Sequence, residues 1–536
     1  MNPPIRGQLA LVLHAHLPYV RHPEHERFLE EEWLHEAVAE SYLPLLSRML
    51  GWEADGVDWR LTLGVTPTLG SMLDDGLLRS RTGRYLEERR ILAASECDRC
   101  VLEPARRRVA EFHLEFYSQS LRLWEAIGGD LCGAWRRLGG SGRLELLGGT
   151  ATHAVLPLLR GDPEGLTRQL DIGREEHRRR FGSDPQGIWL PECAWSPWLD
   201  EVLYRSGVRH LVLETHAVTG AVPRPPAAVF TPVRTPSGIA VFGRDPATAR
   251  QVWSRHGGYP GDPRYREFHR DLAHDAEWDY VRPFLPDTGV RTFSGLKFHR
   301  VTGPTSEKEL YEREDALEAV RGHARHFLES CRNRMERLGP LQGRPPLLTA
   351  PYDAELFGHW WFEGPDFLDA VMRGAAGEGI RTITLSGGRD AWPDAPLAMP
   401  AESTWGEGGH LGVWLDGSNA ILQPQLRQAA RRWVQAEAVG VPAGVDPGFH
   451  RRAMAQATRE LLLAQSSDWP FLIRMGTARE YAMNRFDGHL AAFHRLLDGA
   501  LGEAAPDHHL LLERESAYTL FPETALNRPA GTNRDR

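Results

Sequence analysis

Short apolar runs alternate with longer segments of helical spacing along most of the chain. Several of the short runs are apolar at consecutive positions, which is typical of strands that are covered on both faces. The runs comprise residues 9–16, 59–67, 143–149, 187–192, 210–216, 239–245, 346–353 and 380–388. Because strands that alternate with helices favour parallel pairing, this pattern predicts an α/β fold with a parallel sheet or barrel of seven or eight strands.

Helical spacing dominates the intervening segments, for example residues 31–50 and 313–338. Residues 80–140 are too long for a single crossover and predict two or three helices. From about residue 418 onward the pattern is only helical. We therefore expect a barrel over residues 1–415 with a helical insertion near 80–140, a C-terminal helical domain over 416–525, and a disordered tail over 526–536.

The composition is that of a globular protein, with 41% hydrophobic and 25% charged positions among 536 residues. The net charge of −9, from 63 Lys and Arg against 72 Asp and Glu, disfavours nucleic acid as a partner. No apolar run approaches the ~18 residues of a membrane span, and the first residues lack the cleavage site of a signal peptide. We expect a cytoplasmic protein with no membrane partner.

Cysteine and tryptophan usage each bear on the class of protein. The five cysteines are few and odd in number, which argues against a disulfide framework. Cys97 and Cys100 form a lone C-x-x-C with no second pair at zinc-finger spacing, so we attribute it to chance. The 17 Trp outnumber the 12 Tyr. Indole rings stack well on sugar rings, although they are equally suited to cores.

Histidines follow two of the predicted strands. In a parallel barrel the functional site is built where strands end, so polar residues at these points are informative. His14 and His16 end the first strand and lie on one face of it, since they are two residues apart. They are either a hydrogen-bonded structural pair or a contact to substrate or metal. His153 follows the glycines after the third strand and is weak evidence by itself.

Glu192 follows the fourth strand and lies between Trp189 and Trp195. A carboxylate between aromatic residues is costly to desolvate, so a purely structural role would require a nearby Arg or Lys. This favours a catalytic role for Glu192.

A second carboxylate cluster follows the run that ends near residue 353. Asp353 comes first after the apolar residues and is therefore expected to face the barrel mouth. Glu355 is interpreted as an acid in the first turn of a helix. His359 and Trp360 follow closely and are expected to contact the ligand. Two carboxylates at the ends of different barrel strands are what cleavage of a glycosidic bond through an oxocarbenium-like transition state requires.

At the level of motifs, the sequence resembles glycoside hydrolase family 57, and within it the α-1,4-glucan branching enzymes. The segments that carry the resemblance are 11–21, 146–159, 187–197, 350–365, 403–415 and 466–473. The resemblance implies a distorted (β/α)7 barrel with helical insertions and a C-terminal helical domain that contributes to the active site. It also implies a retaining mechanism with no required cofactor and no metal.

Motif by motif, the resemblance assigns the nucleophile to Glu192 and the general acid/base to Asp353. It further implies that His14, His16 and His153 lie near the bound sugar. The remaining substrate-binding candidates are Trp189, Trp253, Tyr259, His359, Trp360, Trp405, Trp414, Asp468 and Trp469. Core packing is the alternative for each Trp, but Trp405 and Trp414 lie in a Gly-rich loop, where indoles are more often presented for binding.

One segment departs from the family pattern. Some branching enzymes carry a long loop with a Tyr at its tip after the fifth strand, which covers the site. Here residues 219–238 are short, Pro-rich and contain no Tyr. The balance between transfer and hydrolysis therefore stays open, and Tyr259 in its Gly-Pro turn is a candidate to replace part of the lid.

The leading hypothesis is a branching enzyme that cuts an α-1,4-glucan and transfers the piece to a 6-hydroxyl of an acceptor chain. An α-amylase with the same residues and water as acceptor is the nearest alternative. A metal-dependent polysaccharide deacetylase that uses His14, His16 and a strand-end Asp is a remote one. A glucan-binding protein without activity is disfavoured because both carboxylates are retained. Chain-length preference and oligomeric state stay open.

Overall fold

The computed structural model describes residues 3–254 and 257–526. The chain divides into two compact units, which are described separately. Unit 1 comprises Met1–Thr62, Leu73–Glu145 and Asp245–Thr384; unit 2 comprises Leu63–Met72, Leu146–Arg244 and Leu385–Arg536. β2 (Leu61–Val65), α3 (Pro67–Asp74) and β3 (Leu144–Leu147) contain points at which the chain passes from one unit to the other.

Unit 1 is built on a parallel arrangement around β1 (Gly7–Ala15). β1 pairs with β8 (Leu347–Asp353) along its length and with β9 (Ile380–Thr382) at its beginning. Nearly all of β1 is buried, as its uninterrupted apolar sequence predicts. The register sets His14 opposite Asp353. Two of the predicted site residues are therefore neighbours across one strand pair.

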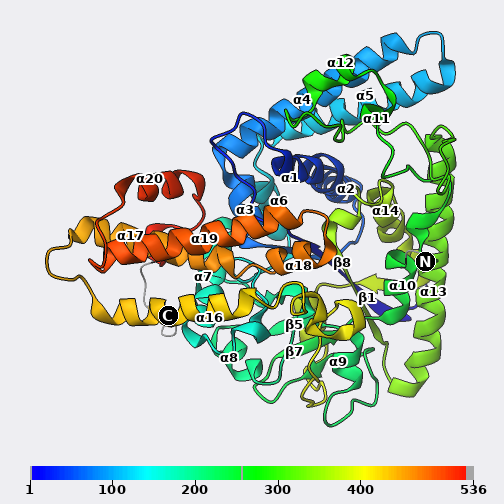
Figure 1. Cartoon of the computed structure of the whole chain (residues 1–536). Coiled ribbons are helices and arrows are strands. Elements are labelled where there is room, and N and C mark those ends of the chain that lie inside the picture. Colours follow the sequence, from blue (N-terminus) through cyan, green and yellow to red (C-terminus); the bar gives the residue numbers. More distant parts are fainter. Residues whose placement is uncertain (1–2, 255–256, 527–536) are drawn as a thin grey trace. The chain divides into compact units, whose positions relative to one another are not determined.

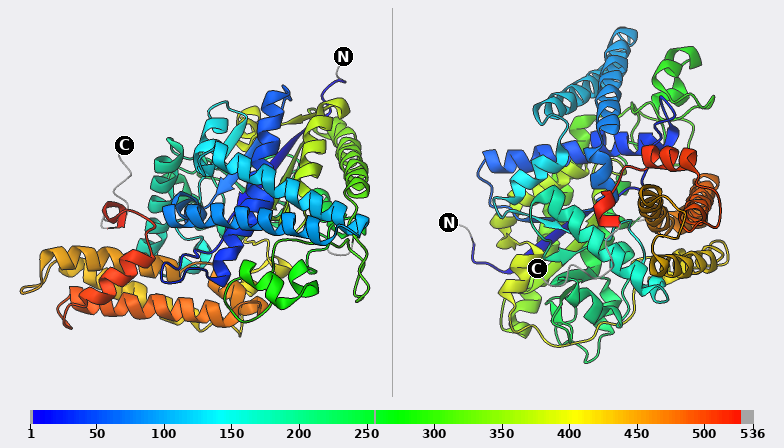
Figure 2. Two further views of the ribbon diagram at one scale, coloured as in Figure 1. Left: turned by 90° about the horizontal axis from the view of Figure 1, so that it is seen from above. Right: turned by 90° about the vertical axis from the view of Figure 1, so that its left-hand side faces the viewer.

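The remaining elements of unit 1 that are labelled in Figure 1 are helices. They are α1 (Glu32–Ala37), α2 (Leu43–Ala54), α4 (Gly76–Arg99), α5 (Pro104–Ala126), α6 (Leu131–Gly139), α10 (Pro246–Trp253), α11 (Leu272–Asp275), α12 (Trp278–Val281), α13 (Arg313–Gln342) and α14 (Gly364–Ala375). α4 and α5 pack together as an antiparallel hairpin (Figure 2). With α6 they occupy the stretch near 80–140 where two or three helices were expected.

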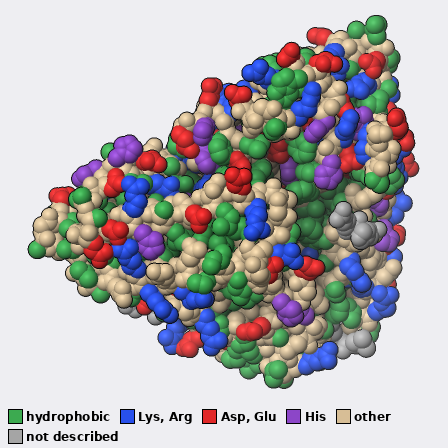
Figure 3. All heavy atoms as spheres, viewed as in Figure 1, with side chains coloured by type: hydrophobic (Ala, Val, Ile, Leu, Met, Phe, Trp, Pro, Cys, Tyr) green, Lys and Arg blue, Asp and Glu red, His purple; other side chains and the backbone are tan. Residues whose placement is uncertain are grey.

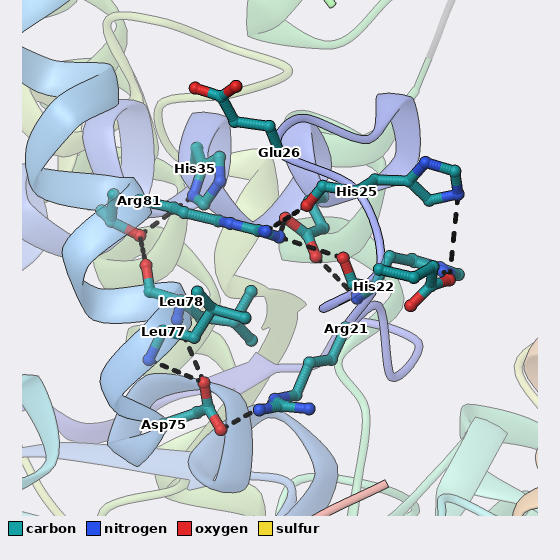
Figure 4. A network of polar contacts seen from close by, with 12 residues as sticks. Arg21, His22, His25, Glu26, His35, Asp75, Leu77, Leu78 and Arg81 are labelled. Carbon is teal, nitrogen blue, oxygen red and sulfur yellow. Dashed lines mark hydrogen bonds and ion pairs between the residues drawn. The ribbon is translucent and has the colours of Figure 1, made fainter. Parts of the chain in front are cut away.

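The segment after β1 is tied to α4 by a buried ion pair (Figure 4). Arg81 of α4 donates to Glu31 at 2.6 Å and to the carbonyl oxygens of His22 and His25. Glu31 in turn accepts from the backbone N–H of His22 at 2.7 Å. Asp75 caps the first turn of α4. The chain that leaves β1 is thus fixed on the helix that follows it.

Unit 2 contains the second sheet. β4 (Gly187–Ile188), β5 (His210–Leu213) and β7 (Ala240–Gly243) are parallel, and β6 (Val233–Arg234) pairs antiparallel with β7. The helices are α7 (Pro163–Phe181), α8 (Leu199–Arg205), α9 (Thr215–Thr219), α15 (Leu385–Ala391), α16 (Leu422–Val439), α17 (Pro447–Ala464), α18 (Asp468–Met475), α19 (Arg479–Ala500), α20 (His508–Ala517) and α21 (Glu523–Leu526).

The C-terminal helices of unit 2 have an apolar core of their own. α17 and α19 lie side by side (orange in Figure 1), and their facing aliphatic and aromatic side chains are buried. A buried carboxylate links three of these helices: Glu460 of α17 contacts His489 of α19 at 2.6 Å and forms an ion pair with Arg514 of α20 at 2.7 Å. Burial alone would raise the pKa of Glu460, but the hydrogen bond from His489 and the charge of Arg514 lower it to about 2.

All eight predicted strands are present, with three differences. The fourth spans only Gly187–Ile188, because the chain turns at the prolyl residue Pro191. The last predicted run ends as a strand at Thr382, and its Leu-Ser-Gly-Gly portion begins α15 instead. The two-residue strand β6 was not predicted, since two residues carry no periodicity. The expected tail over 526–536 lies, apart from Leu526, outside the described residues.

None of the helices in the described part of the chain combines the length and apolar character that a membrane crossing requires. The five cysteines all lie within the described ranges and form no disulfide. On the face drawn in Figure 3, acidic and basic side chains are interspersed. The net negative charge is thus not gathered into one area of that face.

α7 approaches the segment that carries His153 so closely that a glycine is required. A Cβ atom on Gly173 would lie 2.1 Å from the carbonyl oxygen of Gly149 and 3.2 Å from the amide nitrogen of Ala151. Both neighbours are backbone atoms, so they yield only if the segment itself moves. The position of residues 149–153 is therefore set by this contact.

We predict that Gly173→Ala destabilises the protein by ~1–3 kcal/mol or more, because it overpacks a backbone contact. Thermal unfolding measures this. Gly322→Ala in α13 is the matched control, since its Cβ would meet nothing within 4 Å and Ala favours helix by ~1 kcal/mol. Equal melting temperatures for the two variants would contradict the close approach of Gly173 to the backbone of residues 149–151.

Candidate active site

The turn that carries Glu192 has an unusual backbone. Immediately after β4 the chain forms a 3-10 turn over Pro191–Cys193, in which Glu192 has φ 61° and Cys193 φ 48°. His153 also has a positive φ, 57°. Left-handed conformations cost side-chain-bearing residues of order 1–3 kcal/mol each and persist where surrounding contacts impose them. Of the five such residues in the described chain, three lie here, and residues in such conformations cluster at functional sites.

Two neutral donors hold the Glu192 carboxylate. The indole Nε1 of Trp405 donates to Oε2 at 2.8 Å, and the Ser467 hydroxyl donates to Oε1 at 2.9 Å. The backbone N–H of Trp405 also donates to the Glu192 carbonyl oxygen at 3.0 Å. The side chain is 13% exposed. Both carboxylate oxygens are thus oriented by uncharged groups while the side chain keeps some access to solvent.

Ser467 connects Glu192 to His153. His153 Nδ1 lies 2.8 Å from the Ser467 hydroxyl and 3.8 Å from Glu192 Oε1. The Ser467 amide donates to the His153 carbonyl oxygen at 3.1 Å. Sequence reasoning missed Ser467, although it lies in the segment 466–473 that carries part of the family resemblance. Nothing in the segment distinguished the serine that contacts the carboxylate from its neighbours.

Asp468 and Trp469, the two substrate-binding candidates in that segment, have different surroundings. Asp468 begins α18 and accepts from the Ser466 hydroxyl at 2.5 Å. Trp469 is fully buried, and its Nε1 donates to the Leu463 carbonyl oxygen at 2.7 Å. Its ring belongs to the core of the C-terminal helices. This burial favours a supporting role for Trp469.

The predicted tryptophans around Glu192 divide by exposure. Trp405 is half-buried and packs on Trp189 with ring centroids 5.0 Å apart. Trp189 is buried. Trp414, 2% exposed, forms a small apolar cluster with Val155 and Ala194 against which Trp405 packs. Of these three indoles, Trp405 is the one with a surface that a ligand can reach.

In unit 1, Asp353 is the half-buried last residue of β8. Opposite it, His14 is buried, and its ring lies 5.8 Å from the ring of His16 in a stacked arrangement. Burial, and secondly the charge of His16, lower the pKa of His14 well below its ordinary value. His14 is therefore neutral at neutral pH.

Glu355 lies in the 3-10 turn Ala354–Leu356 that directly follows Asp353, as the sequence suggested. Its carboxylate is buried and accepts hydrogen bonds from the Tyr42 hydroxyl and, at 3.1 Å, from the His16 amide. Burial raises its pKa, and the hydrogen bonds from Tyr42 and His16 oppose that rise.

His359 and Trp360 follow that turn. His359 Nδ1 lies 3.2 Å from Glu40 Oε2, which ties the imidazole to a buried acid. Trp360 is 57% exposed and stacks on Phe268 with centroids 4.6 Å apart. One indole face is covered and the ring remains largely accessible, as a sugar-stacking surface requires.

Trp253 and Tyr259 are the two remaining substrate-binding candidates from the sequence. Trp253 ends α10 and is 41% exposed. Tyr259 is 8% exposed, its hydroxyl lies 2.7 Å from His326 Nδ1, and its ring stacks on His323 at 4.6 Å. A ring held in this way moves over a site only by breaking these contacts. The structure thus favours a packing role for Tyr259 over the lid role considered from the sequence.

The short segment 219–238 belongs to unit 2 and packs within it. Val222 forms a β-bridge with Met399, and Val233–Arg234 forms β6. Val229 and Val233 are buried among apolar neighbours of the same unit.

Within residues 3–254 and 257–526, no three His, Cys, Asp or Glu side chains gather closely enough to hold a metal ion.

Two family models match the chain. The model described as glycosyl hydrolase family 57 matches residues 10–387, and the one described as 1,4-alpha-glucan branching enzyme, C-terminal, matches residues 425–528. Among curated proteins, a 1,4-alpha-glucan branching enzyme of Thermococcus kodakarensis is 32% identical over 529 residues, which cover 92% of this chain and 73% of that protein.

Two solved structures are similar throughout. The alpha-amylase AmyC from Thermotoga maritima has a TM-score of 0.89 and 36% identity, covering 98% of this chain and 99% of that one. A branching enzyme of this family from Pyrococcus horikoshii has a TM-score of 0.86 and 34% identity, covering 98% of each chain. The fold class predicted from the sequence, a distorted (β/α)7 barrel with a C-terminal helical domain, is thereby confirmed.

The burial of Trp414 gives a stability prediction. We expect Trp414→Ala to cost ~3–5 kcal/mol of folding free energy, since it removes a buried aromatic ring, and to lower the melting temperature accordingly. Trp360→Ala is the control, because its indole is largely exposed and its loss leaves the melting temperature nearly unchanged. A Trp414→Ala variant as stable as the control would mean that the ring is not a packing residue.

Proposed function

Because the chain belongs to glycosyl hydrolase family 57, we propose that it is a 1,4-alpha-glucan branching enzyme that acts on α-1,4-glucan donor and acceptor chains. One observation carries the proposal: Ser467, from the segment matched by the branching-enzyme C-terminal model, donates to the carboxylate of Glu192. The C-terminal helices thus contribute directly to the candidate nucleophile. The curated relative with this activity supports the same reading.

In the first step, a Glu192 oxygen bonds to the anomeric carbon of the donor while the glycosidic C–O bond breaks. The electron pair of that bond stays on the leaving oxygen, which takes a proton from Asp353. The released fragment departs with a new hydroxyl group. The Trp405 and Ser467 donors keep the attacking carboxylate in one orientation, which lowers the cost of reaching the reactive geometry.

In the second step, the Asp353 carboxylate accepts the proton of an acceptor 6-hydroxyl. The acceptor oxygen bonds to the anomeric carbon, and the bond to Glu192 breaks. Two displacements at one carbon retain its configuration, so an α-1,4 bond becomes an α-1,6 branch. Water in place of the hydroxyl gives hydrolysis.

We assign the glucan contacts to the predicted residues with accessible or polar surfaces. Trp405, Trp360 and Trp253 offer partly exposed indoles for stacking on glucose rings. The neutral imidazole of His14 offers a hydrogen bond to a sugar hydroxyl. The other proposed polar contacts are His16, His153, His359 and Asp468, while Trp189, Trp414 and Trp469 support them from within the core.

An α-amylase is the second candidate. The similarity to the alpha-amylase AmyC favours it, as does the short segment 219–238, which lacks the tyrosine of a lid. Transfer requires that water be kept from the covalent intermediate or that an acceptor binds fast enough to compete. Both activities use the same carboxylates, so only the products distinguish them.

The test is incubation with amylose, counting new α-1,6 linkages against new reducing ends. We expect more branch points than reducing ends, together with a measurable hydrolytic side reaction. An amylose digest that contains reducing ends and no branch points makes the protein an α-amylase.

Removing either carboxylate tests the mechanism. We expect Glu192→Gln and Asp353→Asn each to retain less than about a hundredth of the wild-type rate, since general acid/base catalysis alone contributes ~10²–10⁴. Asp353→Asn should recover partly on a substrate whose leaving group needs no proton, and Glu192→Gln should not. Glu402→Gln, a carboxylate that accepts from Ser196 in unit 2, is the control. A variant that retains more than about a hundredth of the wild-type rate would refute the role given to its residue.

Tyr259 gives a prediction about product ratio. Because its ring and hydroxyl are held by α13, Tyr259→Ala should lower stability and reduce branching and hydrolysis in equal proportion. Branch points and reducing ends are measured on the same amylose digest. A selective rise in reducing ends would restore the lid role.

A further inference from the structure

A π-helical turn over Val38–Tyr42 interrupts the helix between α1 and α2. All five of its residues are buried. π-helical turns are rare and occur frequently at functional sites, since the extra residue per turn redirects side chains that an α-helix would space differently. The apolar spacing of residues 31–50 predicted a helix and did not indicate this turn.

Three consecutive residues of the π-turn contact the chain that follows Asp353. The Tyr42 hydroxyl donates to the Glu355 carboxylate, and the Ser41 hydroxyl donates to the Glu355 carbonyl oxygen at 3.4 Å. The Ser41 oxygen also accepts from the His359 amide at 3.0 Å. Glu40 holds the His359 imidazole at 3.2 Å. Side chain and backbone of the segment 354–359 are therefore both bound to the turn.

The two segments also meet backbone to backbone. Gly358 has φ 121°, and a Cβ atom there would lie 1.8 Å from the Glu40 carbonyl oxygen. Only glycine fits this approach. The segment after Asp353 therefore has one position against the turn rather than a range of them.

The turn is itself anchored. Glu40 forms an ion pair with Arg266 at 2.8 Å, and both side chains are almost completely buried. Burial alone would raise the pKa of Glu40, but the charge of Arg266 holds it well below its ordinary value. An ionised, paired Glu40 makes the π-turn a fixed surface for the segment 354–359.

We propose that the π-helical turn Val38–Tyr42 positions the acid/base Asp353, with Tyr42 and Ser41 as positioning residues that act through the Ala354–Leu356 turn. The inference rests on the role of Asp353 in the proposed function. Asp353 is the residue that precedes this turn, so its orientation follows that of the turn. A displacement of ~1 Å at a reacting group costs up to ~10²-fold in rate.

The charges of both acids, Glu355 and Asp353, act on the Tyr42 hydroxyl. Its pKa is raised by burial, then by the charge and hydrogen bond of Glu355, and by the charge of Asp353. Tyr42 from the π-turn and His16 from the segment after β1 both interact with Glu355. Without the Tyr42 hydroxyl, the Glu355 carboxylate loses one of the hydrogen bonds that hold the turn after Asp353.

The test compares Tyr42→Phe and Ser41→Ala with wild type on two donors, amylose and 4-nitrophenyl maltoheptaoside, whose leaving group needs little protonation. The matched control is Tyr117→Phe, another buried tyrosine of unit 1, whose hydroxyl donates to the Gly295 carbonyl oxygen at 2.8 Å. The values of kcat and KM and the melting temperature are measured for each variant.

For Tyr42→Phe we expect kcat on amylose to fall ~10- to 100-fold with KM little changed. The fall on the aryl glycoside should be clearly smaller. Ser41→Ala should show the same substrate dependence to a smaller extent. Tyr117→Phe should lower only the melting temperature.

Equal losses on both donors, or a Tyr42→Phe that behaves as Tyr117→Phe does, overturn the positioning role. This result is distinct from failure of the proposed function. If Asp353→Asn keeps its rate, the role of Asp353 fails, and if amylose yields only reducing ends, the activity is hydrolytic while the positioning test still applies, since hydrolysis needs the same acid.

Discussion

The candidate site depends on the hydrogen bonds that hold the Glu192 carboxylate in a left-handed turn. The donors come from Trp405, 213 residues away, and Ser467, 275 residues away. A left-handed glutamate is unfavourable in isolation, so the turn persists because these distant contacts and the buried residues around it compensate. The C-terminal helices therefore contribute to this candidate site, because Ser467, one of the two donors, ends the connection between α17 and α18.

Asp353 is held in place by strand pairing and by buried hydrogen bonds to the turn that follows it. Its strand is held by parallel pairing with β1, and the turn that follows it is held by buried polar contacts with the π-helical turn. Buried hydrogen bonds in a low-dielectric environment are costly to break, so such a network admits one arrangement. Both carboxylates thus lie at points where the chain leaves a short buried strand, and each is oriented by groups remote in sequence.

The predicted tryptophans, which the sequence did not distinguish, fall into a buried group and a partly exposed group. Trp414 and Trp469 belong to apolar cores, whereas Trp405, Trp360 and Trp253 keep partly exposed rings. A buried indole lying under an exposed one stiffens the binding surface without touching the ligand. Mutations in both groups are thus expected to affect activity, but only those in the exposed group act through contact.

The sequence by itself determined the strands, the helical C-terminus, the family resemblance and the two carboxylates at strand ends, because these depend on local periodicity and on motifs. It did not determine the left-handed backbone at Glu192, the part of Ser467, the π-helical turn or the burial of Tyr259 and Trp414. Each of these depends on contacts between residues far apart along the chain. Local pattern fixes which residues can form an element, and only tertiary packing decides which side chains meet and which remain exposed.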